Sequence, residues 1–152
     1  MDHKELLNRI RLIRTPTIGP ITSRQLIRRY GNASKALEAI PELSKRGGKK
    51  IIPTTYDLAE KEFASLANIG GFFLAYGADD YPEYLSRFED SPFILSCLGH
   101  SHLLSKPTLS IIGARNASIN SCKYAEKIAS EIGKLGYVVV SGMARGIDRS
   151  AH

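Results

Sequence analysis

Two segments of the chain share one pattern, in which an apolar strand leads into a glycine turn that carries an arginine and precedes a helix. They are residues 108–118 and 137–148. A helix that follows a strand directly returns the chain over the sheet, so this pattern is typical of parallel βαβ units. We therefore predict strands at 108–112 and 137–140, in a parallel sheet buried on both faces.

The segment between these strands has the pattern of one long helix, residues 118–135. Apolar or small residues share one of its faces at helical spacing: Ile119, Cys122, Ala125, Ile128, Ala129, Ile132 and Leu135. Ser118 is placed to cap the helix and Gly136 to end it. Upstream, residues 72–76 and 92–99 are short apolar runs, and we predict two further strands of the sheet there.

The first 68 residues have a different hydrophobic pattern, because their apolar residues recur every three or four positions. Helices are predicted over 4–14, 20–30, 34–40 and from Thr54 onward. Asp2 is placed to cap the first of these helices, and Pro41 to end the third. The predicted fold class is therefore α/β, with a small all-helical domain at 1–68 and a parallel-sheet domain at 69–152. Because such a sheet usually has more strands, we expect the chain to be the N-terminal portion of a longer protein.

Charge is distributed unevenly along the chain, whose formal net charge is +6. Residues 1–68 hold 13 Lys and Arg against 7 Asp and Glu, residues 69–100 hold 1 against 5, and residues 101–152 hold 7 against 3. Two basic regions around an acidic connector suit a polyanionic partner, although a solvated basic surface has the same composition. The Pro- and Gly-punctuated stretch at 41–53 is predicted to be a connecting segment or exposed turn.

Composition and motifs disfavour several protein classes. No apolar run approaches the ~20 residues of a membrane helix, and the N-terminus lacks the apolar core of a secretory signal. Cys97 and Cys122 have neither CxxC nor metal spacing, so we predict reduced thiols in a cytoplasmic protein. We predict no metal, because His100 and His102 have no third ligand nearby in the sequence. We also predict no cofactor.

The candidate ligand site lies in the two glycine turns. A turn between a strand and a helix start aims backbone N–H groups at one point where an anion binds, and arginine adds donors suited to phosphate. We predict a phosphate-binding shelf for nucleic acid formed by Gly113, Arg115, Ser118, Ser141, Gly142, Arg145 and Gly146. Both arginines also fit a simpler interpretation as surface residues. Asp148 is interpreted as a stabiliser of its helix start.

Other chemistry at these turns is disfavoured. Arg115 and Ser118 stand where a GxGxxG fingerprint has its second and third glycines, and Ser141 replaces the acidic residue that binds ribose. Neither turn is followed by a Walker lysine, which disfavours an NTPase. Ser141 has no base near it in sequence and no GxSxG elbow, which disfavours nucleophilic catalysis.

Two other features bear on DNA. The turn Ile18-Gly19-Pro20, followed by Arg24 and Arg28, has features of a helix-hairpin-helix contact but lacks that motif's second glycine, so we favour a packing turn. Tyr124 and Tyr137 are interpreted as structural. Phosphate capture would then dominate over base stacking.

At its two turns the chain resembles the DNA processing protein A family (DprA, also called Smf). The resembling segments are Ile112-Gly113-Ala114-Arg115, Ser141 to Asp148 with Ala151-His152, Tyr81 to Leu85, Asp90 to Leu95, and Ile18-Gly19-Pro20. The resemblance implies a SAM-like helical domain and a Rossmann-like domain that dimerises. It implies binding of single-stranded DNA in a pocket lined by Arg115 and the 141–146 loop. It also implies handover to the RecA recombinase in natural transformation.

The charge distribution, the two turns and the family resemblance are compatible with three classes of function. We favour a nucleic-acid-binding module without enzymatic activity. A nucleotide-hydrolysing enzyme of the lysine-decarboxylase-like Rossmann group also uses glycine loops after strands, but its Pro-Gly-Gly and Glu pattern is absent from these 152 residues. The third class is an interaction scaffold, whose basic N-terminal domain would contact an acidic protein.

Overall fold

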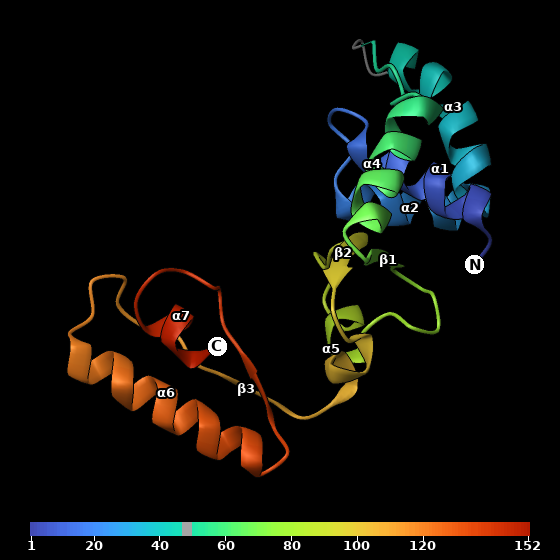
Figure 1. Ribbon diagram of the computed structural model, residues 1–152. Coiled ribbons are helices and arrows are strands. Elements are labelled where there is room, and N and C mark those ends of the chain that lie inside the picture. The colour runs from blue at the N-terminus through green and yellow to red at the C-terminus, as the bar shows by residue number, and fades with distance from the viewer. Residues whose placement is uncertain (47–49) are drawn as a thin grey trace. The chain divides into compact units, whose positions relative to one another are not determined.

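The computed structural model describes residues 1–46 and 50–152, so residues 47–49 of the predicted connecting segment lie outside the described residues. Two compact units divide the chain, an N-terminal unit of Met1–Ser101 and a C-terminal unit of His102–His152 (Figure 1). The elements in chain order are α1 His3–Arg14, α2 Pro20–Tyr30, α3 Ala33–Arg46, α4 Tyr56–Asn68, β1 Gly71–Ala75, α5 Glu83–Ser86, β2 Ile94–Leu98, a 3₁₀ turn η1 Ser101–Ser105, β3 Thr108–Ser110, α6 Ile119–Lys134, β4 Val138–Val140 and α7 Ile147–Ala151. None of the described helices is long and apolar enough to cross a membrane.

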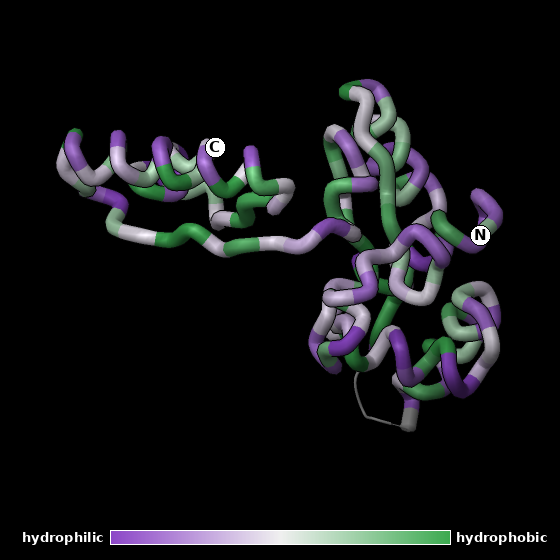
Figure 2. Tube along the Cα trace, turned by 90° about the horizontal axis from the view of Figure 1, so that it is seen from below, coloured by the Kyte–Doolittle hydropathy of each residue, from purple (hydrophilic) through white to green (hydrophobic). Residues whose placement is uncertain are grey.

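The N-terminal unit has its core along α1, whose Leu7, Ile10 and Leu12 are at most 1% exposed. Leu12 belongs to an apolar cluster with Ile40 of α3, whereas Leu7 and Ile10 belong to a second cluster with Phe73 of β1. The hydropathy colouring shows hydrophobic and hydrophilic residues mixed along the coils of the unit that begins at the N label (Figure 2). Helices α1 to α4 hold most of the described residues before β1, which confirms the predicted helical character of this part of the chain.

The predicted end of the third helix at Pro41 is wrong, because α3 continues through the proline to Arg46. An internal proline costs a helix about 3 kcal/mol. Ile40 and Leu43, on either side of it, both pack into the core, and their burial offsets that cost. The first part of the predicted 41–53 segment is thus helical.

Helix starts follow the predicted capping chemistry with one exception. The Asp2 side chain accepts from Glu5 N–H at 2.7 Å, and Ser118 caps α6 in the same way. The fourth helix is capped by Thr55 rather than Thr54. Thr54 is engaged elsewhere, because its N–H donates to the hydroxyl of a threonine after α1.

Strands β1 and β2 form an antiparallel pair, with Gly71 opposite Leu98 and Ala75 opposite Ile94. The prediction that they join the later strands in one parallel sheet is therefore wrong. Parallel neighbours are usually joined by a helix long enough to cover the sheet. Between β1 and β2 the chain has only the four-residue α5, so it returns antiparallel.

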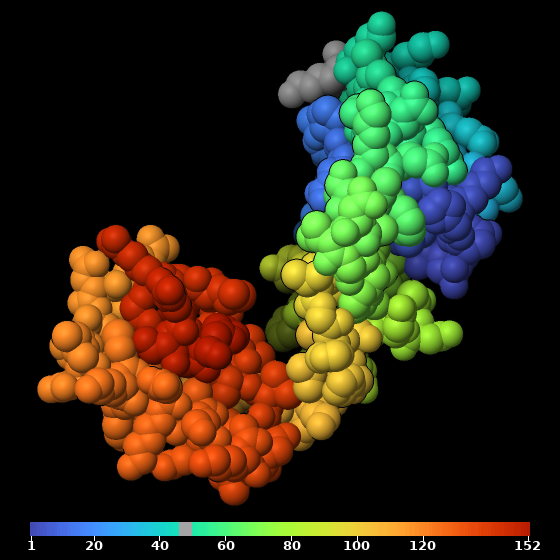
Figure 3. Space-filling model, viewed as in Figure 1, coloured from blue at the N-terminus to red at the C-terminus, as the bar shows by residue number. Residues whose placement is uncertain are grey.

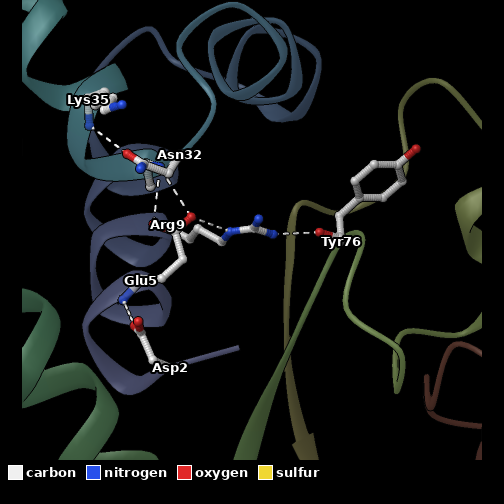
Figure 4. Close-up of polar contacts among 7 residues, drawn as sticks. Asp2, Glu5, Arg9, Asn32, Lys35 and Tyr76 are labelled. Carbon is white, nitrogen blue, oxygen red and sulfur yellow. Dashed lines mark hydrogen bonds and ion pairs between the residues drawn. The ribbon is translucent and has the colours of Figure 1, made fainter.

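A polar network ties α1 to the start of α3 and to the end of β1 (Figure 4). The Glu5 carboxylate accepts from Ala33 N–H at 3.1 and 3.2 Å and from Arg9 Nε at 2.9 Å. Arg9 also donates to the Tyr76 carbonyl at 2.6 Å. These contacts join the β1–β2 pair to the helices, so both belong to the N-terminal unit. The predicted domain boundary between residues 68 and 69 stays a prediction.

In the C-terminal unit, β3 and β4 pair in parallel from Thr108 opposite Val138 to Ser110 opposite Val140, with α6 between them. This confirms the predicted βαβ arrangement. Helix α7 packs against α6 (Figure 3). The prediction of strands buried on both faces is wrong here, because the helix packing falls mainly on β4 and every residue of β3 is exposed.

Both cysteines are free thiols, as the sequence predicts, and both are half-buried. Burial raises the pKa of the Cys97 thiol above its ordinary value, and Asp80 adds to the effect. The neutral thiol is therefore favoured at Cys97, which lowers its reactivity.

Candidate nucleic-acid interface

The two glycine turns begin side by side at the carboxyl ends of β3 and β4. The pairing continues one residue beyond the strands, where Ile111 N–H donates to the Val140 carbonyl at 3.0 Å. Ligands of open α/β sheets bind beyond the carboxyl ends of the strands. The structure thus brings the predicted segments 113–118 and 141–146 to one edge of the strand pair.

Glycine lets the two turns press against each other. Gly146 has φ +87°, and a Cβ there would lie 2.2 Å from the Ala114 carbonyl oxygen and 2.7 Å from the Arg115 carbonyl oxygen. A Cβ at Gly113 would lie 2.6 to 2.8 Å from side-chain atoms of Ile147. Position 113 therefore requires glycine for space, and position 146 requires it for both space and backbone conformation. This close approach places Arg115 next to the second turn.

Asp148 joins the two turns through its carboxylate. This side chain belongs to a residue that is 6% exposed; Oδ1 accepts from Gly113 N–H at 3.2 Å and Oδ2 from Gly142 N–H at 3.1 Å. The sequence predicts that the amides of these turns bind an anionic ligand. The amides of Gly113 and Gly142 instead donate to the protein's own carboxylate. Sequence reasoning missed this role, since Asp148 lies 35 residues from Gly113 and only the strand register brings them together.

The two arginines of the turns remain available to a ligand. Arg115 and Arg145 are both exposed, and neither side chain has a hydrogen-bond or ion-pair partner within residues 1–46 and 50–152. In the N-terminal unit, by contrast, Arg9 and Arg14 are paired with glutamates. Exposed guanidinium groups without a carboxylate partner are suited to bind phosphate.

The two serines of the predicted site have local partners. Ser118 Oγ accepts from Ser121 N–H at 3.2 Å as the cap of α6. Ser141 Oγ accepts from Met143 N–H at 3.3 Å and lies 2.7 Å from His152 Nε2. The structure thus places a base beside Ser141, which its sequence neighbourhood does not indicate. Whether these seven predicted residues bind a ligand stays a prediction.

Arg24, on the helix after the Gly19-Pro20 turn, is 7% exposed. Its guanidinium donates to the backbone carbonyls of Phe88, Glu89 and Ser91. The same group lies 4.5 Å from the centre of the Tyr76 ring. Arg24 therefore anchors the segment before β2, in keeping with the packing turn that the sequence favours over a DNA contact.

Tyr124 and Tyr137, interpreted above as structural, are both on the surface. Tyr124 is 67% exposed and stands on α6 between the exposed Lys123 and Lys127. Exposed aromatic rings on a basic surface are a feature of proteins that bind single-stranded nucleic acid.

Comparison with known proteins decides the family. Residues 72–152 match the family described as DNA recombination-mediator protein A, and residues 3–65 match the DprA-like N-terminal HHH domain. The chain belongs to the DprA/Smf family. The membership predicted from its motifs is thereby confirmed.

Curated relatives within the DprA/Smf family support the assignment. The chain is similar to DNA processing protein DprA of Streptococcus pneumoniae, with 38% identity over 74 residues, 49% of this chain and 26% of that protein. It is similar to DprA of Bacillus subtilis, with 30% identity over 105 residues, 68% of this chain and 35% of that protein. Protein Smf of Synechocystis is 34% identical over 84 residues, 53% of this chain and 21% of its own length. The chain thus matches between a fifth and about a third of the length of these relatives.

Proposed function

We propose that this chain binds single-stranded DNA through phosphate contacts of Arg115 and Arg145 on the two glycine turns. The proposal is carried by the packing of Gly146 on the backbone of Arg115, which holds the two turns together. Residues 102–152 hold seven Lys and Arg against three Asp and Glu, and one of these acids, Asp148, is buried. The exposed charge of this unit is therefore strongly positive, as a phosphate backbone requires.

A preference for single strands is supported by Tyr124. Single-stranded DNA exposes its base faces, which stack on aromatic side chains, whereas a duplex hides them. Tyr124 is exposed on the helix that follows the first turn, and Lys123 and Lys127 of the same helix are exposed as well. Phosphate capture at the turns and base stacking on α6 together favour a single strand.

Family membership extends the proposal to the cell. The relatives are named for DNA processing, and we place this chain in the same process, as a carrier of single-stranded DNA that hands it to the RecA recombinase in natural transformation. A homodimer formed through the Rossmann-like domain and a cytoplasmic location belong to the same proposal.

The role we propose is that of a non-enzymatic mediator. Ser141 and His152 pair a hydroxyl with a base, because Ser141 Oγ lies 2.7 Å from His152 Nε2. A serine nucleophile works with a base that a third, acidic group orients. The Asp148 carboxylate is instead held by the amides of Gly113 and Gly142. Release of ribose phosphate from nucleoside monophosphates would favour the hydrolase alternative.

Fluorescence anisotropy with a labelled oligo-dT tests the binding proposal. Arg115→Glu should weaken binding by about tenfold or more, because a hydrogen bond to a charged group contributes about 1.5–3 kcal/mol. The matched control is Lys134→Glu, the same charge reversal at an exposed residue at the end of α6. If the two variants lose the same affinity, only general electrostatics is acting and the proposed contact is wrong.

A further inference from the structure

Asp148 is a buried carboxylate whose described hydrogen-bond partners include no lysine or arginine. Each of its two oxygens accepts from the backbone amide of a different glycine turn, Gly113 at 3.2 Å and Gly142 at 3.1 Å. Burying a charge without a cationic partner is costly, so hydrogen bonds must hold it in place. The space is fitted to this group, since a Cβ at residue 142 would lie 3.1 Å from Oδ2.

We propose that Asp148 is the positioning residue of the phosphate site. Its carboxylate fastens the two turns to each other and thereby sets the separation of Arg115 and Arg145. This inference rests on the proposed function, because it assigns the way in which the two arginines meet one strand. Asp148 itself touches no ligand; it acts through the two turns.

The same carboxylate defines the class of ligand. Backbone amides of glycine turns are the groups that cradle the phosphates of free nucleotides. Here the amides of Gly113 and Gly142 are already occupied by an anion of the protein, so a ligand phosphate meets arginine side chains instead. A row of singly charged phosphodiesters along a strand fits two such arginines. The concentrated charge of a polyphosphate is repelled by Asp148.

Amide hydrogen exchange measured by NMR on the 152-residue chain tests the fastening directly. In Asp148→Ala, the amides of Gly113 and Gly142 should both exchange at least tenfold faster. Asp148→Asn should give an intermediate result, because its single carbonyl oxygen can accept from one turn. The matched control is Glu131→Ala, which removes an exposed carboxylate of α6.

Oligo-dT binding by the same variants tests the positioning. Asp148→Ala should lose about tenfold in affinity. The slope of log affinity against log salt should fall by about 0.7, the contribution of one phosphate contact to a single strand, because the two arginines no longer engage together. A purely structural role would leave this slope unchanged. If circular dichroism shows that Asp148→Ala is unfolded, the affinity and the salt slope of Asp148→Asn test the positioning role instead.

Two outcomes overturn the positioning role: unchanged exchange at both glycines, or faster exchange with unchanged affinity and salt slope. Inorganic triphosphate should displace labelled oligo-dT no better than sulfate at matched ionic strength, and selective displacement overturns the ligand class. These failures are distinct from failure of the proposed function, which shows as oligo-dT binding that ignores Arg115→Glu.

Discussion

Replacement of Arg24 by methionine tests whether this arginine is a structural anchor. Methionine keeps the apolar stem and removes only the guanidinium, which bonds the carbonyls of Phe88, Glu89 and Ser91 and lies over the Tyr76 ring. We expect a large loss of stability in the N-terminal unit.

The magnitude follows from which partners water can replace. Phe88 and Glu89 are exposed, so their carbonyls can be rehydrated, whereas Ser91 is 3% exposed and its carbonyl stays unsatisfied. An unsatisfied buried acceptor costs about 1–3 kcal/mol, and the lost cation–π contact adds about 0.5–2 kcal/mol. The free energy of unfolding should fall by about 3 kcal/mol.

Urea denaturation followed by far-UV circular dichroism measures this change in the 152-residue chain. Arg28→Met is the matched control, because Arg28 lies one turn later on α2 and is exposed. It should change the free energy of unfolding by less than about 0.5 kcal/mol. A loss below about 1 kcal/mol for Arg24→Met would refute the anchoring role.

Further substitutions probe the second turn and the β1–β2 connection. Gly146→Ala should destabilise the C-terminal unit by more than about 2 kcal/mol, because φ is +87° and the new Cβ would lie 2.2 Å from a carbonyl oxygen. Gly133→Ala, in open space on α6, should stabilise the same unit, and thermal denaturation compares the two. Tyr81→Phe should cost about 1 kcal/mol by removing the 2.7 Å bond to the Pro92 carbonyl. Burial raises the pKa of Tyr81 above its ordinary 10.0, so its contribution is complete below pH 10 and falls as the pH rises further. Urea denaturation measures the free energy of unfolding at pH 8 and pH 11. This free energy should fall less between the two pH values in the phenylalanine variant than in the original chain, and an equal fall would contradict the prediction.

Local chemistry could be predicted from the sequence wherever one segment supplies all the partners. Asp2 and Ser118 cap their helices because the amides they accept from lie three residues on. The parallel pair of β3 and β4 follows from a helix of sufficient length between two apolar strands. Contacts of this kind depend on spacing along the chain, which the sequence contains.

Contacts between distant segments could not be predicted in this way. Arg24 is buried because it bonds to carbonyls 64 to 67 residues away in the sequence. Its position on the helix is equally compatible with an exposed side chain. Asp148 looks like an ordinary helix-start acid until the register of β3 and β4 brings Gly113 to it. The direction of β2 is likewise absent from its apolar pattern, which is the same for parallel and antiparallel pairing.

Chemical-shift mapping of the 152-residue chain with oligo-dT tests most directly whether both turns bind one strand. The two-turn site predicts that backbone amides at 113–118 and at 141–146 shift together, with a single dissociation constant, and that added salt reverses both sets of shifts. Shifts confined to the N-terminal unit, or different dissociation constants for the two turns, would contradict it.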